Sequence, residues 1–213
     1  MITAILMMAG NASRMQMNEN KVYLPLGKQK IFEYSLNLFL DMGFEVICVI
    51  REEDRNQLDP YKKRVKIAIG GKTRQESVYK GLQEATGEYV LIHDAARPFV
   101  SQDLIVGCCE AFEENCACLV ATPSKDSLYL KTPLGSLNRD NVVLAQTPQG
   151  AKTKVMLECH QKAKAEGYVG TDDISLFIRY SKEMVKIIAG NDKNFKITTQ
   201  LDYIIAKELM KDA

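Results

Sequence analysis

Residues 2–21 read "ITAILMMAGNASRMQMNENK", an apolar run that leads into a polar turn. In 2–9 apolar residues follow one another without alternation, which is typical of a strand buried on both faces of a parallel sheet. The turn carries Gly10, Arg14 and Lys21. Backbone N–H groups at such a place can face an anion, so the turn could bind phosphate. It could equally be an ordinary strand-to-helix connection with basic residues on it.

The same pattern recurs along the chain. Further apolar runs predict buried strands at 45–50, 65–69, 88–93 and 117–122. Amphipathic segments between them predict helices over 30–43, 73–87 and 101–115. Alternation of strands and helices predicts a Rossmann-like α/β fold, a mostly parallel sheet with helices on both faces. With 213 residues, the chain fits a single domain, 1–213.

Local signals mark the ends of these helices. Gly43 and Gly87 are suited to follow a helix C-terminus. Thr73 and Glu76 have the spacing of a capping box, and Ser101 is a good N-cap.

The alternation breaks at about 123–145, which we expect to be a projecting β-arm. Two short alternating stretches, "SLYLK" (127–131) and "NVVLAQ" (141–146), predict a hairpin. A long arm with little core of its own needs a partner surface, so a homodimer is expected. Beyond the arm we predict two helices, at 152–167 and after 171–173, a strand at 185–188 and a last helix from about Thr199.

Composition limits the possible partners and the cellular location. There are 28 Lys and Arg residues against 27 Asp and Glu, a net charge of +1, so no general attraction to nucleic acid or to an anionic membrane is expected. None of the six cysteines has the C-x-x-C spacing of a zinc site, which favours reduced thiols in a cytoplasmic protein. The first residues lack the basic segment of a signal peptide.

Two further turns contain residues that could bind a ligand or take part in a reaction. In "GGKTRQESV" (70–78) paired glycines allow a flat ligand to approach, although a well-capped strand-to-helix turn explains the same residues. In "HDAARPF" (93–99) Asp94 ends a strand, where it could meet magnesium or a ribose hydroxyl. The alternative is an ion pair between Asp94 and Arg97 that locks the turn, and we expect His93 to pack at the strand edge.

Three later segments are unremarkable alone. "RDNVVLAQTPQG" (139–150) contains Arg139, "GTDDISL" (170–176) contains Thr171 as a helix cap, and "NFKITT" (194–199) contains Lys196. Surface cations and a cap are the default interpretations of these residues.

Taken in order, however, these strings closely resemble the 2-C-methyl-D-erythritol 4-phosphate cytidylyltransferase family, over about residues 3–209. The resemblance implies transfer of CMP from CTP to a polyol phosphate, with Mg²⁺ as cofactor and a homodimer whose arms interlock. The loop departs from the family's usual pattern at Met7, Met8, Ala12 and Asn20.

The resemblance also implies residue roles. Arg14 and Lys21 would stabilise charge in the transition state. The substrate phosphate would be held by Lys196 and by Arg139 from the partner subunit, with Thr171 and Ser127 also at the substrate. Asp94 would serve the magnesium–CTP complex. The remaining nucleotide contacts would be Met8, Ala9, Gly10, Asn11, Gly71, Lys72, Ser77, Ala95 and Arg97.

The chemistry of phosphates explains why the sequence shows neither a Ser–His–Asp set nor paired carboxylates. The second pKa of a phosphate monoester is roughly 6, so the attacking oxygen is already ionised at neutral pH. No general base is needed, and positioning together with fixed positive charge can carry catalysis.

Three other functions are compatible with parts of this sequence. A sister family transfers CMP to ribitol 5-phosphate, and the residues at 73–77, Ala96 and 171–173 favour methylerythritol over it. A nucleotide-binding module without catalysis is disfavoured because both Arg14 and Lys21 are present. A nicotinamide-dependent dehydrogenase is disfavoured because the three-glycine fingerprint is missing.

Overall fold

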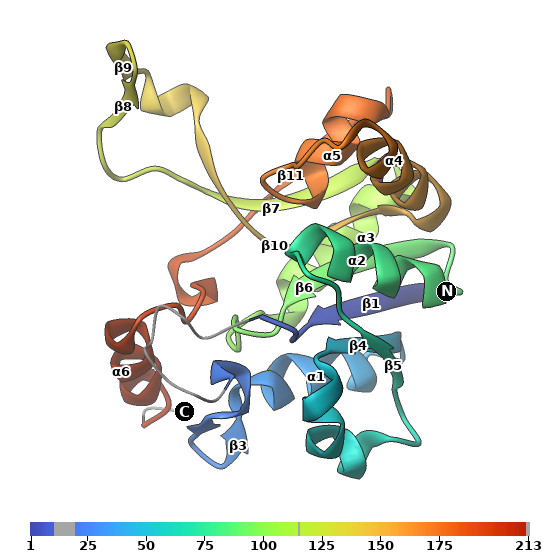
Figure 1. The fold of residues 1–213 in the computed structure, drawn as a ribbon. Helices are drawn as coiled ribbons and strands as arrows, with labels where there is room; N and C mark the ends of the chain where they lie inside the picture. The colour runs from blue at the N-terminus through green and yellow to red at the C-terminus, as the bar shows by residue number, and fades with distance from the viewer. Residues whose placement is uncertain (11–19, 115, 212–213) are drawn as a thin grey trace.

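A computed structural model describes residues 1–10, 20–114 and 116–211. Its centre is a seven-stranded sheet with the order β11-β7-β10-β6-β1-β4-β5 (Figure 1). All neighbours are parallel except β10, which is antiparallel to both β6 and β7. The mostly parallel sheet is therefore confirmed. Its strands are β1 (Ile2–Met7), β4 (Glu45–Ile50), β5 (Lys66–Ile69), β6 (Tyr89–Asp94), β7 (Ala117–Pro123), β10 (Val143–Lys152) and β11 (Val185–Ala189).

Helices cover both faces of this sheet, as predicted. They are α1 (Ile31–Asp41), α2 (Arg74–Glu84), α3 (Gln102–Glu113), α4 (Thr153–Glu166), α5 (Asp173–Tyr180) and α6 (Gln200–Leu209). Successive β1 side chains enter opposite cores: Leu6 packs with α1 and α3, and Ile5 packs with α2, α4 and α5. None of the helices in the described ranges is long and apolar enough to cross a membrane.

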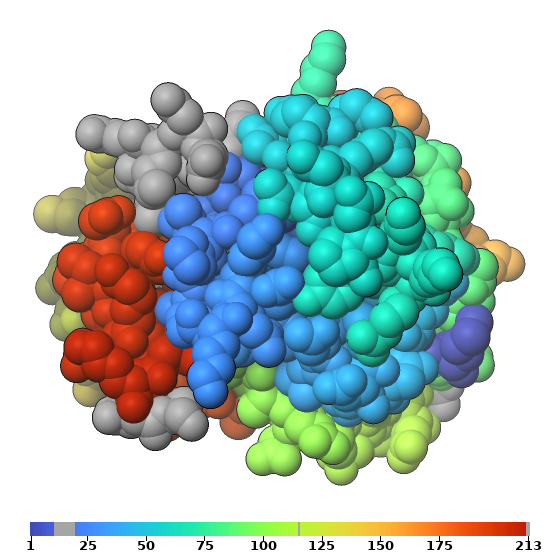
Figure 2. All heavy atoms as spheres, turned by 90° about the horizontal axis from the view of Figure 1, so that it is seen from below, coloured from blue at the N-terminus to red at the C-terminus, as the bar shows by residue number. Residues whose placement is uncertain are grey.

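Short elements complete the chain. They are β2 (Pro25–Leu26), β3 (Gln29–Lys30) and the 3-10 helices η2 (Lys21–Tyr23), η3 (Glu52–Tyr61), η4 (Arg139–Asn141) and η5 (Asp192–Asn194). A small third core joins α6 to residues 20–31, and Figure 2 shows α6 beside this segment. The Tyr203 hydroxyl donates to the Pro25 carbonyl at 2.5 Å, which ties the C-terminal helix to the segment after the first loop.

Most predicted helix ends are confirmed. Gly43 follows α1 with a φ of 75°, and Ser101 caps α3. The Thr73 hydroxyl accepts from the Glu76 amide at 3.1 Å. Only half of the predicted capping box forms, because the Glu76 carboxylate accepts from the Lys72 amide, one residue before the cap.

Three local predictions were wrong. Helix α2 ends at Glu84, and Gly87 serves instead as a contact point where a Cβ would lie 2.7 Å from the Thr3 amide. Strand β5 is not buried on both faces, because it forms the edge of the sheet. The cap of α5 is Asp172, whose side chain accepts from the Ser175 amide at 2.8 Å, and not Thr171.

The arm projects from the sheet (Figure 1) but differs from the expected hairpin. Its strands are β8 (Leu128–Lys131) and β9 (Leu134–Leu137), which pair with each other across a tight turn. The stretch that we expected to complete the hairpin belongs to β10, where residues 143–145 pair with the end of β7. The arm's return segment is thus also a strand of the central sheet.

Candidate active site

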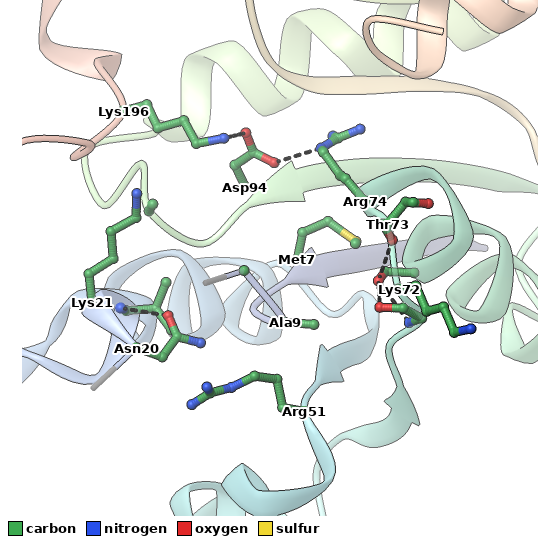
Figure 3. Close-up of a pocket in the computed structure, with 15 residues that line it drawn as sticks. Met7, Ala9, Asn20, Lys21, Arg51, Lys72, Thr73, Arg74, Asp94 and Lys196 are labelled. Carbon is green, nitrogen blue, oxygen red and sulfur yellow. Dashed lines mark hydrogen bonds and ion pairs between the residues drawn. The ribbon is translucent and has the colours of Figure 1, made fainter. Parts of the chain in front are cut away.

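The carboxyl ends of β1, β4, β5 and β6 meet at a cavity of about 400 Å³. Figure 3 shows the side chains around it. The described residues that line it are Met7, Ala9, Gly10, Asn20, Lys21, Val22, Arg51, Gly71, Lys72, Thr73, Arg74, Ser77, Asp94, Ala96 and Lys196. This edge of an open α/β sheet is where such folds bind ligands.

Backbone contacts hold the loops at this edge together. The Met8 amide donates to the Val49 carbonyl and the Gly70 amide to the Ile50 carbonyl, both at 2.8 Å. A Cβ on Gly70 would lie 2.6 Å from the Ala9 Cβ, so glycine lets the two loops touch. Asn20, a departure from the family pattern, donates from Nδ2 to the Met8 carbonyl at 2.5 Å. This bond joins the described residues on either side of 11–19.

Asp94 lies between two cations. Its Oδ2 accepts from Lys196 Nζ at 2.6 Å and its Oδ1 from Arg74 Nε at 3.3 Å (Figure 3). Burial alone would raise the pKa of Asp94, but Arg74 and Lys196 outweigh it and hold the pKa far below its ordinary value. Asp94 is therefore ionised, and it fixes two positive charges at the cavity wall.

Arg74 continues this chain of charges away from the cavity. Its Nη2 lies 2.8 Å from Oδ2 of Asp173, which is 1% exposed. His160 Nε2 lies 3.4 Å from the other Asp173 oxygen. Burial alone would raise the pKa of Asp173, but Arg74 and His160 lower it. Neither Arg74 nor Asp173 was predicted, although both lie within the two motif strings "GGKTRQESV" and "GTDDISL".

On its backbone side, Asp94 is held by a buried histidine and threonine. The Asp94 amide donates to Thr147 Oγ1 at 3.1 Å, and Thr147 Oγ1 lies 3.1 Å from His93 Nδ1. His93 Nε2 lies 3.1 Å from the Arg97 carbonyl, so it carries the proton while Nδ1 accepts from the hydroxyl. Burial lowers the pKa of His93 to about 4. His93 is the penultimate residue of β6 and is fully buried against Phe39, so it packs at the end of its strand as expected.

Arg97 does not lock the turn through an ion pair with Asp94. Its Nη1 donates to the Asn194 carbonyl at 2.7 Å, whereas the described ion pairs of the Asp94 carboxylate are with Arg74 and Lys196. The turn is closed by the backbone, because the Arg97 amide donates to the Asp94 carbonyl at 2.9 Å. Arg97 does not line the cavity in the described part of the chain. It joins the turn after β6 to the segment before Lys196 and so helps to place that lysine.

Among the expected nucleotide and phosphate contacts, the cavity brings together Ala9, Gly10, Lys21, Gly71, Lys72, Ser77, Asp94 and Lys196. Met8 and Ala95 are buried beside it, and their amides already donate to the Val49 and Met7 carbonyls. Asn11 and Arg14 lie outside the described residues, as does Ala12.

Ser77 shapes the turn at the cavity wall. Its Oγ accepts from the Gly71 amide at 2.9 Å and donates to the Thr73 carbonyl at 2.8 Å. Because the side chain is 3% exposed, little of its hydroxyl faces the cavity.

The remaining predicted substrate residues lie apart from the cavity lining described within this chain. Thr171 and Ser127 are exposed. Arg139 is exposed on the arm, and its Nη1 donates to the Lys125 carbonyl at 3.2 Å.

Comparisons with known proteins agree with this geometry. A family model described as 2-C-methyl-D-erythritol 4-phosphate cytidylyltransferase matches residues 2–212. The enzyme of that name from Aquifex aeolicus is 38% identical over 213 residues, covering 99% of this chain and 98% of that protein. The one from Bacillus thuringiensis is 36% identical over 223 residues, with the same coverage.

Solved structures show the same fold. The 4-diphosphocytidyl-2C-methyl-D-erythritol synthase of Anaerococcus prevotii is 31% identical with a TM-score of 0.88, covering 99% of this chain and 98% of that one. The 2-C-methyl-D-erythritol 4-phosphate cytidylyltransferase of Thermus thermophilus is 30% identical with a TM-score of 0.82, covering 97% and 98%. The chain therefore belongs to the 2-C-methyl-D-erythritol 4-phosphate cytidylyltransferase family.

Proposed function

We propose that this cytidylyltransferase transfers CMP from CTP to 2-C-methyl-D-erythritol 4-phosphate at the described cavity. The products are 4-diphosphocytidyl-2-C-methyl-D-erythritol and pyrophosphate. The match of the family model to residues 2–212 is the observation that carries this proposal. The cavity supports it, because it gathers residues from four of the family's strings at the ligand-binding edge of the sheet.

The reaction is an exchange of bonds at the α-phosphorus. An oxygen of the substrate phosphate forms a bond to this phosphorus while the bond to the bridging oxygen of pyrophosphate breaks. Charge grows on the five-coordinate transition state, so fixed cations accelerate the reaction. We assign this role to Lys21 and Lys196 at the cavity, together with Arg14.

The two substrates divide the cavity between them in this proposal. Ala9 and Gly10 offer backbone amides to the triphosphate, and the turn formed by Gly71, Lys72 and Ser77 faces the base. Lys196, which Asp94 holds at 2.6 Å, presents its remaining N–H groups to the phosphate of the second substrate.

Mg²⁺ is part of the proposal. The described residues contain no group of three His, Cys, Asp or Glu side chains that could hold a metal ion. One cavity carboxylate, Asp94, is nevertheless suited to an ion that takes most of its ligands from water and nucleotide phosphates. Asp94 would hold it, and the ion would neutralise charge on the departing pyrophosphate.

The quaternary arrangement follows from the arm. We propose a homodimer, placed in the cytoplasm, in which residues 1–213 act as one domain and Arg139 completes the partner's site. The arm exposes Tyr129 by 63% and Leu134 by 81%, which favours burial against another subunit. Thr171 and Ser127 would then contact the second substrate from the rim of the site.

Pyrophosphate release tests the function. The protein is incubated with CTP, Mg²⁺ and either 2-C-methyl-D-erythritol 4-phosphate or ribitol 5-phosphate, and then with other nucleoside triphosphates. We expect release with CTP and the methylerythritol substrate, and at least about tenfold less with ribitol 5-phosphate, since lost hydrogen bonds in a polar site are costly. Faster release with ribitol 5-phosphate would assign the chain to the sister activity. No release with either polyol would leave only a nucleotide-binding role.

A further inference from the structure

Arg51 lies directly after β4, between the two loops that bound the cavity. The carbonyls just before it, of Val49 and Ile50, accept from the amides of Met8 and Gly70 at 2.8 Å. Figure 3 shows the Arg51 side chain extending below Ala9, across the cavity from Asp94 and Lys196. Arg51 thus lines the side of the cavity opposite Asp94, to which we assign the metal ion, and Lys196, to which we assign the phosphate of the second substrate.

A buried carboxylate fixes the plane of the Arg51 guanidinium. Its Nε and Nη2 donate to the two carboxylate oxygens of Asp54, at 2.7 and 2.8 Å. Asp54 is 7% exposed, whereas the Arg51 side chain keeps 26% of its surface exposed. Bidentate pairing with a buried partner holds the guanidinium in one orientation and leaves its flat face available.

The charges around Arg51 favour a neutral ligand group over phosphate. Glu53 Oε1 lies 3.3 Å from Nη1, so one positive charge faces two negative ones, of Asp54 and Glu53. Such a group attracts a triphosphate weakly. A guanidinium plane can still stack on a nucleobase, because stacking does not depend on net charge in the same way.

The cavity also offers a base few other flat surfaces. None of its described lining residues is aromatic. The other lining arginine, Arg74, lies on the Asp94 side of the cavity, where it joins Asp94 to Asp173 (Figure 3). We propose that Arg51 is a nucleotide-affinity residue whose guanidinium plane, fixed by Asp54, flanks the cytosine of bound CTP. This inference rests on the proposed function.

Binding of CMP and CTP tests it without turnover. Dissociation constants are measured by calorimetry for the wild type and for Arg51→Met and Arg51→Lys. Loss of one stacking surface costs about tenfold in affinity. We expect both variants to lose that factor, for CMP and CTP alike, because lysine keeps the charge but has no plane. Arg51→Met/Asp54→Asn removes the carboxylate that the single variant would leave unpaired, and it should show the same loss if Arg51→Met folds poorly.

Arg55→Met is the matched control. Arg55 lies in the same segment and also pairs with a carboxylate three residues away, Glu52 at 2.6 Å, but it does not line the cavity, so its variant should bind CMP normally. Weaker CTP binding with unchanged CMP binding would place Arg51 at the β- and γ-phosphates and overturn the inference. Full affinity of Arg51→Lys for both nucleotides would also overturn it, because the charge alone would then suffice. If the wild type binds CMP and releases pyrophosphate while Arg51→Met binds normally, only this inference fails. If the wild type itself neither binds CMP nor turns over CTP, the proposed function fails.

Discussion

At the scale of single residues, the site depends on an alternating row of charges. Lys196, Asp94, Arg74 and Asp173 follow one another with N–O distances between 2.6 and 3.3 Å. Each carboxylate is buried, and each would be costly to bury without its cations. Arg74 is the one member that contacts both carboxylates, so the negative charges of Asp94 and Asp173 both depend on it for a positive partner.

The sequence identified Asp94 and Lys196 but not the bond between them. They lie 102 residues apart, and only the return of the chain after η5 brings them together. Arg74 and Asp173 were missed for a different reason. Asp173 is the first residue of α5, and the helix dipole explains an acidic residue there without a buried partner. Arg74 is the first residue of α2, where the dipole does not favour a cation, but exposure to solvent is the default interpretation of an arginine.

Removing Arg74 should destabilise the fold. We expect Arg74→Met to lower the free energy of unfolding by about 3 kcal/mol, because Asp173 would remain buried without its cation. Adding Asp173→Asn should recover most of this loss. Urea unfolding followed by circular dichroism measures both variants. Lys186→Met, which removes the exposed pair with Glu114, should cost less than about 1 kcal/mol. A double variant no more stable than Arg74→Met would show that the unpaired carboxylate is not the cause.

At the scale of elements, the antiparallel strand β10 is central to the site. It lies between β6 and β7, and Thr147 within it contacts both His93 and the Asp94 amide. Asn194 of η5 donates from Nδ2 to the Thr147 carbonyl at 2.9 Å, which links the strand to the segment that carries Lys196. Three distant segments are thus joined behind Asp94.

The parallel strands were predictable because each is a compact apolar run. Strand β10 was not, because its first residues, 143–145, are exposed and lie within the predicted arm, and its later part contains Thr147-Pro148-Gln149, which resembles a turn. Polar residues are tolerated there because they find buried partners. The Gln149 side chain bonds the Asp172 carboxylate and accepts from the Asp173 and Ile174 amides.

His93 should make stability depend on pH. Its pKa is lowered to about 4 in the folded protein, against an ordinary value of 6.5, so the unfolded chain binds a proton first as the pH falls. The contribution of neutral His93 to the free energy of unfolding is fully present above about pH 7. It falls as the pH drops below 6.5 and stops changing below about pH 4. Between pH 7 and 5 the loss should be about 2 kcal/mol. Urea midpoints across this range measure it, and His93→Gln should flatten the slope although it is less stable at pH 7. An equal slope in both proteins would exclude His93 as the source.

At the scale of the whole molecule, the arm is the feature that the rest of the chain does not explain. It carries an apolar set that nothing in the described chain covers: Tyr129, Leu130, Leu134, Leu137, Val143 and Leu144. The arm also carries Arg139 away from the cavity of its own chain. An isologous dimer would bury the apolar set of each arm and bring one Arg139 to each site.

Mixing two inactive variants tests this arrangement. Lys21→Ala should disable the site of its own chain, and Arg139→Met should disable the site of its partner. Each variant alone should lose activity by about a hundredfold, the cost of removing one group that stabilises transition-state charge. In a mixed dimer, the chain with Lys21 intact receives Arg139 from the other chain, so one of the two sites is complete. Unfolding and refolding an equimolar mixture should therefore recover about a quarter of wild-type activity, because half of the dimers are mixed.

Two controls distinguish a variant that fails to form dimers from one that forms dimers but lacks a catalytic group. Light scattering should give twice the chain mass of 23.9 kDa for the wild type and for both variants. Leu134→Asp places a charge on a residue that is 81% exposed in the single chain, and it should give monomers that cannot complement either variant. If the mixture stays inactive while light scattering shows dimers, Arg139 serves its own subunit or no site. A fully active monomer would remove the partner from the mechanism, and the apolar arm would then need another explanation.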